Sequence, residues 1–448
     1  MPVSSLTESE GDFRRLWRRP RYPGFVLTVS LSRTSGMIFT TAGVLLVLAR
    51  TGSASLAGAT AAAAVLPAAF TGPVLGAWLD VARRRRVLIV FDQLLSAVAL
   101  LGIVAVAGHA PAWTLPAITI VYGITRPFSS GSFLSALAHI VGPELLDQAS
   151  AVEATSLNLA VIIGPALGGL LVAVVGAAPT VEVQAALSLL VAVLVAGNPA
   201  FEARDAERSH SVSHALRAGL TALLHERVLL ATSLAGGLAA FGWGLMMIGF
   251  PLYAIRTLHS HAHASGYLWA AVAAGSILGT FVLHGPPGLR RVGFSYGILG
   301  LSALLWPLAA SLAVGIALIG LTGFLEGPAY SGTIALRQRH VPPAVGAQVM
   351  TTLNGVSGLA VAAGAALGGV VDDPLGLIVV FTAVNLIAAA SAVASATDPP
   401  ATGLGRTLTH FHPDDRPSLN LDEHSVASQA GLRNRLHTLK EGFRKLPR

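Results

Sequence analysis

The sequence predicts an all-α membrane protein in which twelve transmembrane helices form two six-helix pseudo-repeats. Composition is the first observation, because the 448-residue chain is 53% hydrophobic and only 11% charged, which is too apolar for a soluble protein of this length. The second is a series of apolar runs of about 20 residues, long enough to cross a bilayer of roughly 30 Å. The third is an internal repeat.

The repeat is clearest in a segment of small residues that occurs twice, 200 positions apart. Gly164-Pro-Ala-Leu-Gly-Gly169 returns as Gly364-Ala-Ala-Leu-Gly-Gly369. Each copy lies inside a long apolar run. A membrane chain built from two similar halves can place a binding site between them and rock one half against the other. The duplication therefore indicates transport before any single residue does.

The apolar runs and the polar segments between them place the expected elements along the chain. We expect helices near residues 23–49, 56–78, 87–107, 113–137, 150–176, 180–198, 228–254, 265–284, 293–312, 314–336, 347–371 and 375–397. They form an N-terminal bundle at 23–198 and a C-terminal bundle at 228–397, joined by a polar cytoplasmic linker at 199–227, with cytoplasmic tails at 1–22 and 398–448. In the last tail, leucines at 432, 436 and 439 share one face. That segment is either a basic amphipathic helix on the inner leaflet or a solvated, unstructured tail.

Basic residues gather on one side of the predicted membrane. Of the 29 Lys and Arg residues, 25 fall in the tails, the linker and the loops of one side, including Arg337 in an expected loop at 337–346. Only Arg50 and Arg256 fall on the other side, and Arg33 and Arg126 lie within helices. This asymmetry predicts that both termini are cytoplasmic and that the number of spans is even. We expect a bacterial inner (plasma) membrane protein, and the net charge of +7 is not a nucleic-acid footprint.

Several classes of chemistry are disfavoured by what the sequence lacks. There are no Cys residues, so disulfides and thiolate metal sites are excluded. No Gly-x4-Gly-Lys-Ser/Thr motif is present, which argues against an ATP-driven pump, and no nucleophile–base constellation indicates an enzyme. The alternating histidines His259, His261 and His263 could bind a metal weakly, but a solvated loop is the better interpretation. We expect no cofactor, no bound metal and a monomer.

A charged loop follows the second expected helix. Its sequence, Gly76-Ala-Trp-Leu-Asp80-Val-Ala-Arg83-Arg-Arg-Arg86, resembles the loop signature of the major facilitator superfamily. That resemblance implies a gating latch in which Gly76 lets helices approach while Asp80 and Arg84 hold the cytoplasmic side closed. The family usually has Gly where this chain has Arg83. The alternative is a basic membrane anchor with one incidental acid.

The first copy of the duplicated segment resembles the antiporter signature of the same superfamily, which implies export. Its residues are Gly164, Pro165, Gly168 and Gly169. Proline removes a helical hydrogen bond and bends the helix, and the paired glycines Gly168 and Gly169 are expected to permit close contact across the interface between the halves. The signature is partial, because Ala160 and Ala151 stand where further glycines are usual. Ordinary packing of small residues is the alternative. The arrangement also resembles the branch of siderophore, macrolide and drug exporters.

Charged residues inside the expected helices require a reason, since each costs about 3 kcal/mol or more at the bilayer centre. Arg33, Arg126 and Glu326 fall on helices that line the central cavity in this family. Glu326 is the first choice for a proton-coupling carboxylate, and a static ion pair of Glu326 with Arg33 or Arg126 is the alternative. Asp92 is the second choice for coupling, although we expect Asp92 and Glu153 to brace the arginine loop.

The expected cavity is wide, mostly apolar and supplied with a few polar side chains, which suits amphipathic organic molecules. Besides Arg33 and Arg126, its candidate lining residues are Tyr122, Phe241, Trp243 and Tyr330. For any one aromatic residue, packing against lipid or protein is the alternative.

These features predict a secondary active transporter that exports a drug or secondary metabolite in exchange for protons, in the manner of multidrug-resistance antiporters. Its partners would be protons, the small-molecule substrate and the lipid bilayer. An uptake porter or facilitator on the same fold is the first rival. A membrane receptor or assembly protein without transport activity is the second.

Overall fold

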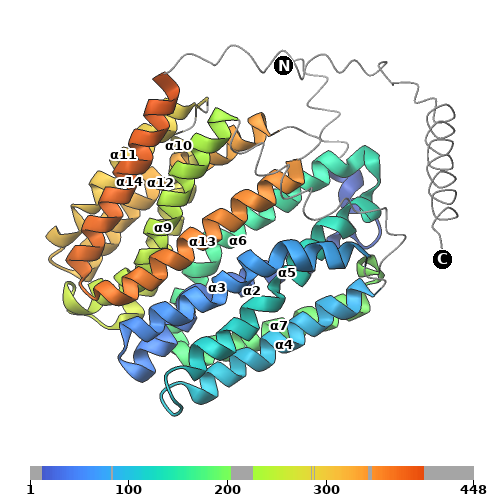
Figure 1. Cartoon of the computed structure of the whole chain (residues 1–448), viewed down its shortest axis with the longest axis horizontal. Coiled ribbons are helices and arrows are strands. Elements are labelled where there is room, and N and C mark those ends of the chain that lie inside the picture. Colours follow the sequence, from blue (N-terminus) through green and yellow to red (C-terminus); the bar gives the residue numbers. More distant parts are fainter. Residues whose placement is uncertain are drawn as a thin grey trace, which may run out of the picture. The chain divides into compact units, whose positions relative to one another are not determined.

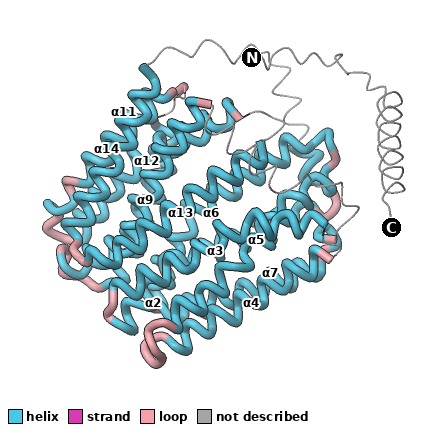
Figure 2. The backbone as a smooth tube through the Cα atoms, viewed as in Figure 1, coloured by secondary structure: helices cyan, strands magenta, loops and turns pink. Residues whose placement is uncertain are grey.

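The computed structural model describes residues 13–81, 84–202, 226–283, 285–286, 288–341 and 346–397. Within these ranges the chain is helical and contains no strand, and its helices are joined by short loops (Figure 2). This is expected of a chain in a bilayer, where every backbone polar group must find its partner inside the protein. The predicted all-α class is confirmed.

Six long helices precede the linker and six follow it in the described part of the chain (Figure 1). The first six are α2 (Tyr22–Thr51), α3 (Ala54–Val81), α4 (Arg85–Val106), α5 (Thr114–Val141), α6 (Leu146–Val175) and α7 (Ala177–Gly197). The second six are α9 (Arg227–Arg256), α10 (Ser265–Val282), α11 (Leu289–Ala303), α12 (Leu312–His340), α13 (Gly346–Val371) and α14 (Pro374–Thr397). Among the residues described, nine helices are long and apolar enough to cross a membrane. Twelve spans and the linker and tail boundaries stay predictions.

One helix differs clearly from its prediction. A span was expected at 293–312, but α11 begins at Leu289 and ends at Ala303, and a 3-10 turn, Trp306–Leu308, follows it. Pro307 explains the early end, because proline has no N–H and disfavours helical backbone at the preceding residue. The buried Trp306 side chain anchors this turn by donating from Nε1 to Thr322 Oγ1 of α12 at 2.9 Å.

The two six-helix groups meet through two helix pairs, in which α6 packs on α10 and α13 packs on α3. Both contacts are glycine against glycine. A Cβ added at Gly169 of α6 would lie 2.3 Å from Gly266 Cα of α10, and one added at Gly58 of α3 would lie 3.0 Å from Gly369 Cα of α13. These two close approaches, called here the glycine contacts, lie near the ends of their helices. By the predicted orientation they close the outer side.

The glycines of the duplicated segment make the same two kinds of helix contact in both copies. A Cβ at Gly164 would lie 2.2 Å from Met37 Cβ of α2, and one at Gly168 would lie 2.6 Å from the Ile38 carbonyl oxygen. The equivalent residues Gly364 and Gly368 lie against α9 of their own half. Close contact between the halves was expected of the paired glycines, but of each described pair only the last glycine, Gly169 or Gly369, makes it. The other glycines of the motif let helices of the same half pack closely against each other.

Replacing the glycine at one of these contacts tests the packing. We expect Gly169→Leu to destabilise the purified protein by about 1–3 kcal/mol, as overpacking does, because its side chain has no space beside Gly266. The matched control is Gly355→Leu in α13, since a Cβ at Gly355 meets no atom within 4 Å. Thermal unfolding in detergent is the measurement, and equal melting temperatures for the two variants would contradict this packing.

Candidate functional site

A small polar pocket lies inside the N-terminal half, between α2, α4, α5 and α7. Its volume is about 50 Å³, enough for a few water molecules or one polar group. Serines, glutamines and charged side chains dominate its wall: Ser32, Arg33, Ser35, Gly36, Asp92, Gln93, Ser96, Tyr122, Arg126, Gln184 and Ser188. The pocket thus combines Arg33, Tyr122 and Arg126, predicted as cavity residues, with Asp92, predicted for proton coupling.

Arg126 is held in place by its neighbours. Its Nη1 donates to the Tyr122 hydroxyl at 2.7 Å, one helical turn away, and Gln184 Nε2 of α7 donates to the same hydroxyl at 3.2 Å. The guanidinium lies against Gly36 of α2, where an added Cβ would be 2.0 Å from Nη2. A larger residue at position 36 would displace this charge. Gly36, which the sequence analysis did not single out, therefore leaves the space that the Arg126 guanidinium occupies.

Asp92 lies on α4 and is almost completely buried, with 1% of its surface exposed. Gln93 Nε2 lies 3.1 Å from Asp92 Oδ2 and donates to it. A buried carboxylate in a low-dielectric interior is held by charges and hydrogen-bond donors around it. Here the pocket brings Asp92 to the same small space as two guanidinium groups.

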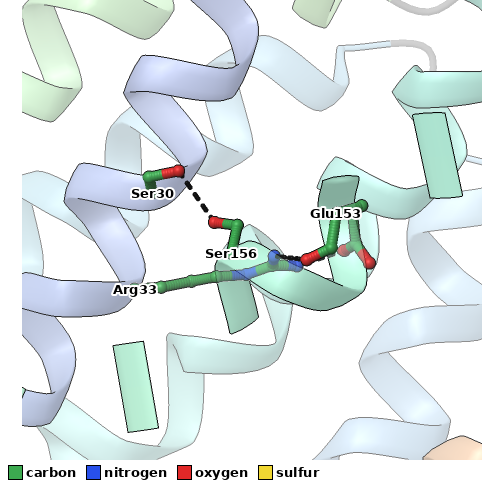
Figure 3. Close-up of polar contacts among 4 residues, drawn as sticks. All are labelled: Ser30, Arg33, Glu153 and Ser156. Carbon is green, nitrogen blue, oxygen red and sulfur yellow. Dashed lines mark hydrogen bonds and ion pairs between the residues drawn. The ribbon is translucent and has the colours of Figure 1, made fainter. Parts of the chain in front are cut away.

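Arg33 of α2 makes an ion pair with Glu153 of α6 (Figure 3). Its Nη1 also donates to the Glu153 backbone carbonyl at 3.0 Å, and the Ser30 and Ser156 hydroxyls are 2.7 Å apart beside the pair. Glu153 was expected to brace the arginine loop, and that expectation is wrong. The carboxylate reaches Arg33 because both side chains lie on the facing sides of two packed helices.

Glu326 lies in the other half, on α12, where it is partly buried and hydrogen bonds with Ser276 of α10. Arg33 pairs with Glu153 instead, so the static ion pair of Glu326 with Arg33 is not formed. A pair of Glu326 with Arg126 stays a prediction. Tyr330 follows one turn later on α12 and is also partly buried.

The aromatic candidates on α9 pack largely within the C-terminal half. The Trp243 ring centre lies 5.2 Å from that of Phe381 and 5.8 Å from that of Trp269, in a cluster that fills the helix interfaces. Phe241 presents its backbone carbonyl to Gly364. Trp243 therefore packs against other aromatic side chains of the protein, as the alternative interpretation stated.

The predicted latch is only partly visible. Gly76 and Asp80 belong to α3, but the surroundings of Gly76 and the side chain of Asp80 lie outside what the structure describes. Arg84 is exposed and precedes the first residue of α4. Within the described part of the chain, no group of three His, Asp or Glu side chains could hold a metal ion.

Arg337 differs from its prediction. It was counted in a cytoplasmic loop, but it lies within α12 and only 4% of its surface is exposed. Its Nη2 donates to the Thr232 carbonyl of α9 at 2.9 Å, and an added Cβ at Gly236 would lie 2.6 Å from the same nitrogen. Gly36 and Gly236, 200 positions apart, thus each seat a guanidinium from a helix of their own half. The recurrence of this glycine at the repeat spacing is the sequence signal that could have predicted both arginine positions.

Helices with an internal duplication, buried charges and a polar pocket define a multi-pass membrane transporter, and the comparisons with known proteins agree. The model of the Major Facilitator Superfamily matches residues 25–293. The multidrug efflux pump Tap of Mycobacterium tuberculosis is 30% identical over 361 residues, covering 76% of this chain and 84% of Tap. The uncharacterised MFS-type transporter y4rN of Sinorhizobium fredii is 25% identical, covering 88% of this chain and 98% of its own. The chain belongs to the major facilitator superfamily.

Further similarities concern half of the chain or the fold alone. The enterobactin exporter EntS of Escherichia coli is 29% identical over 253 residues, which cover 53% of this chain and 58% of EntS. The solved nucleoside transporter NupG superposes with a TM-score of 0.64 at 13% identity, covering 85% of this chain and all of that one. A bacterial homologue of the human lysosomal transporter Spinster gives 0.62 at 14% identity, covering 85% and 99%. The predicted fold and family are confirmed, and like its relatives the chain is a transporter of small molecules rather than an enzyme.

Removing the Tyr122 hydroxyl tests how the pocket is held. Tyr122→Phe takes away the acceptor shared by Arg126 and Gln184, and a hydrogen bond to a charged group contributes about 1.5–3 kcal/mol. We expect the transport rate of a lipophilic cation such as ethidium to fall by roughly tenfold, the factor that 1.4 kcal/mol represents. Tyr267→Phe is the control, because the exposed Tyr267 of α10 lies outside the pocket. Equal rates in both variants would show that the hydroxyl does not matter.

Proposed function

We propose that the protein is a proton-coupled exporter of small amphipathic organic compounds, with both termini in the cytoplasm. The observation that carries this proposal is the pocket in which Asp92 meets Arg126 and Arg33. An acid that gains or loses a proton beside fixed cations changes the charge of the pocket, and that change can be linked to substrate binding. The names of two relatives, a multidrug efflux pump and an enterobactin exporter, support the export direction.

The duplicated scaffold supplies the movement. Alternating access in such proteins consists of rocking one repeat against the other around a fixed site. The glycine contacts allow the halves to meet closely at one end, and the predicted latch of Gly76, Asp80 and Arg84 would hold the opposite end. The partial antiporter signature at Gly164–Gly169 also supports transport in the export direction.

Asp92 ranks before Glu326 as the coupling carboxylate, in reverse of the order that the sequence suggested. Asp92 shares its pocket with Arg126 and Arg33. Glu326 has Ser276 as its hydrogen-bond partner and lies in the other half. The rival function is uptake on the same fold, because the fold is shared with a nucleoside transporter and with a POT family peptide transporter and the fold alone does not set the direction of transport.

Direction is tested in everted membrane vesicles with ethidium as the probe. Acidifying the vesicle interior should drive ethidium inward, because the exporter exchanges it for protons leaving the vesicle. Collapse of the pH gradient with nigericin should release it, and an imposed sodium gradient should have no effect. Loss of preloaded ethidium on acidification would instead establish proton-coupled uptake as the physiological direction.

Neutralising each candidate acid identifies the coupling residue. We expect Asp92→Asn to lower proton-driven ethidium accumulation at least tenfold, since its carboxamide binds no proton in the physiological range. Glu326→Gln should retain most of it, and the exposed Glu182→Gln of α7 is the matched control. The reverse result, with Glu326→Gln inactive and Asp92→Asn active, would restore Glu326 to that role.

A further inference from the structure

A short helix at residues 13–18, called here the N-terminal helix, lies close to the membrane surface. The long helix α2 begins four residues later at Tyr22 and is long and apolar enough to cross a membrane. Its 30 residues extend over about 45 Å, which is the thickness of a bilayer with its headgroups, so Tyr22 lies at headgroup level. Four residues of chain reach about 14 Å at most, which keeps the N-terminal helix near that level.

The sequence of the N-terminal helix separates apolar from basic side chains. At about 100° per residue, its apolar side chains fall within one arc of roughly 100°: Phe13, Leu16 and Trp17. Its arginines fill the remaining arc: Arg14, Arg15 and Arg18. A basic helix that carries aromatic residues and leucine on its other face lies in the plane of a membrane interface.

The apolar face fixes the N-terminal helix to the bundle. Leu16 is completely buried in a cluster that also contains Ile89 of α4 and Leu137 of α5. The Trp17 ring packs edge-on against the Tyr22 ring of α2, with the ring centres 5.6 Å apart. The helix is therefore a fixed part of the N-terminal half, and its basic face keeps one orientation relative to α2.

The basic face keeps a positive charge that the described acids do not balance. Arg14 and Arg18 are exposed and lie one helical turn apart, on the same face. No acidic side chain that the structure describes makes an ion pair with either of them. Glu144, whose carboxylate reaches this segment, pairs with Arg19 instead. Two neighbouring guanidinium groups on one face can hold phosphate oxygens through charge-assisted hydrogen bonds.

The exposed aromatic side chains select a lipid as the occupant of this surface. Phe13 is 37% exposed and Trp17 is 47% exposed. Aromatic residues with one apolar and one polar side are enriched at the membrane–water interface, where their rings lie among the headgroups. An acidic protein would also attract the arginines, but the height of this helix beside the start of α2 places both rings against lipid.

We propose that the N-terminal helix is a binding site for anionic phospholipids, whose headgroup phosphates bind Arg14 and Arg18 while Phe13 and Trp17 lie between the headgroups. The choline of a zwitterionic lipid would repel the same arginines, so the site prefers lipids with a net negative charge. Because Leu16 and Trp17 connect the helix to the bundle, bound lipid stabilises the N-terminal half. This inference goes beyond the proposed function and depends neither on the direction of transport nor on proton coupling.

Native mass spectrometry of the purified full-length protein tests the proposal. The probes are phosphatidylglycerol and phosphatidylcholine with identical acyl chains, and the readout is the ratio of their Kd values for the first bound lipid. A basic residue near an anionic surface strengthens binding by about fivefold. We therefore expect Arg14→Gln/Arg18→Gln to lower the preference for phosphatidylglycerol at least tenfold. Raising ammonium acetate from about 0.1 M to about 1 M should lower the wild-type preference as well, because the Debye length falls from about 10 Å to about 3 Å.

Two further double variants separate this site from general charge effects. Arg290→Gln/Arg339→Gln removes the same charge from exposed arginines of α11 and α12 and should leave the preference near the wild-type value. Arg14→Lys/Arg18→Lys keeps the charge and should keep most of the preference. Thermal unfolding in detergent gives a second readout, in which added phosphatidylglycerol should raise the melting temperature of the wild type more than that of Arg14→Gln/Arg18→Gln.

Two results would overturn the inference. If both glutamine variants lower the preference equally, lipids respond to the net charge of the protein and not to this helix. If neither variant changes it, the helix does not bind lipid, and an acidic protein segment becomes the occupant to test. The measurement involves no transport, so either result leaves the proposed function standing, and failure of proton-driven ethidium transport in vesicles would leave the lipid site standing.

Discussion

The contact of glycine with glycine between the two halves is the constraint on which the rest of this structure depends. In a bilayer, lipid tails are as apolar as leucine, so helices associate through close packing and internal polar contacts rather than through a hydrophobic driving force. Gly169 with Gly266 and Gly58 with Gly369 bring backbones to distances that no side chain allows. Because each contact follows directly on glycines that pack helices together within one half, the proposed rocking movement would turn each half as one body about the contact.

Buried charge is the second constraint, and three buried or partly buried arginines find their partners within their own half. Arg33 meets Glu153, Arg126 meets the Tyr122 hydroxyl, and Arg337 meets a backbone carbonyl. Each of these contacts lies within one half, so a change in one half does not break a charge pair with the other. Among these contacts, none crosses the interface, so glycine packing is what connects the halves there.

Much of the fold was accessible from the sequence, because a bilayer leaves a chain few choices. Apolar runs of the right length placed every described long helix but one close to its observed bounds, and the repeat spacing indicated two halves. The exception, α11, ends at Ala303, shortly before Pro307, whose effect on the backbone the hydropathy pattern did not register. The site was harder. Periodicity placed Arg126 and Tyr122 on one face of α5, but nothing in the sequence reports that Asp92 on α4 reaches the same pocket. Glu153 and Arg337 were misplaced because distance along the chain says little about which neighbouring helix a long side chain meets.

The most direct test of this account measures the distance across the glycine contact while the protein works. The chain contains no Cys, so cysteines introduced at the exposed residues Val175 of α6 and His263 before α10 would be its sole thiols for spin labels. Double electron–electron resonance should then resolve two distance populations, one short and one long, whose ratio changes with pH and with ethidium. A single distance that stays the same under all these conditions, in labelled protein that still transports, would contradict the account.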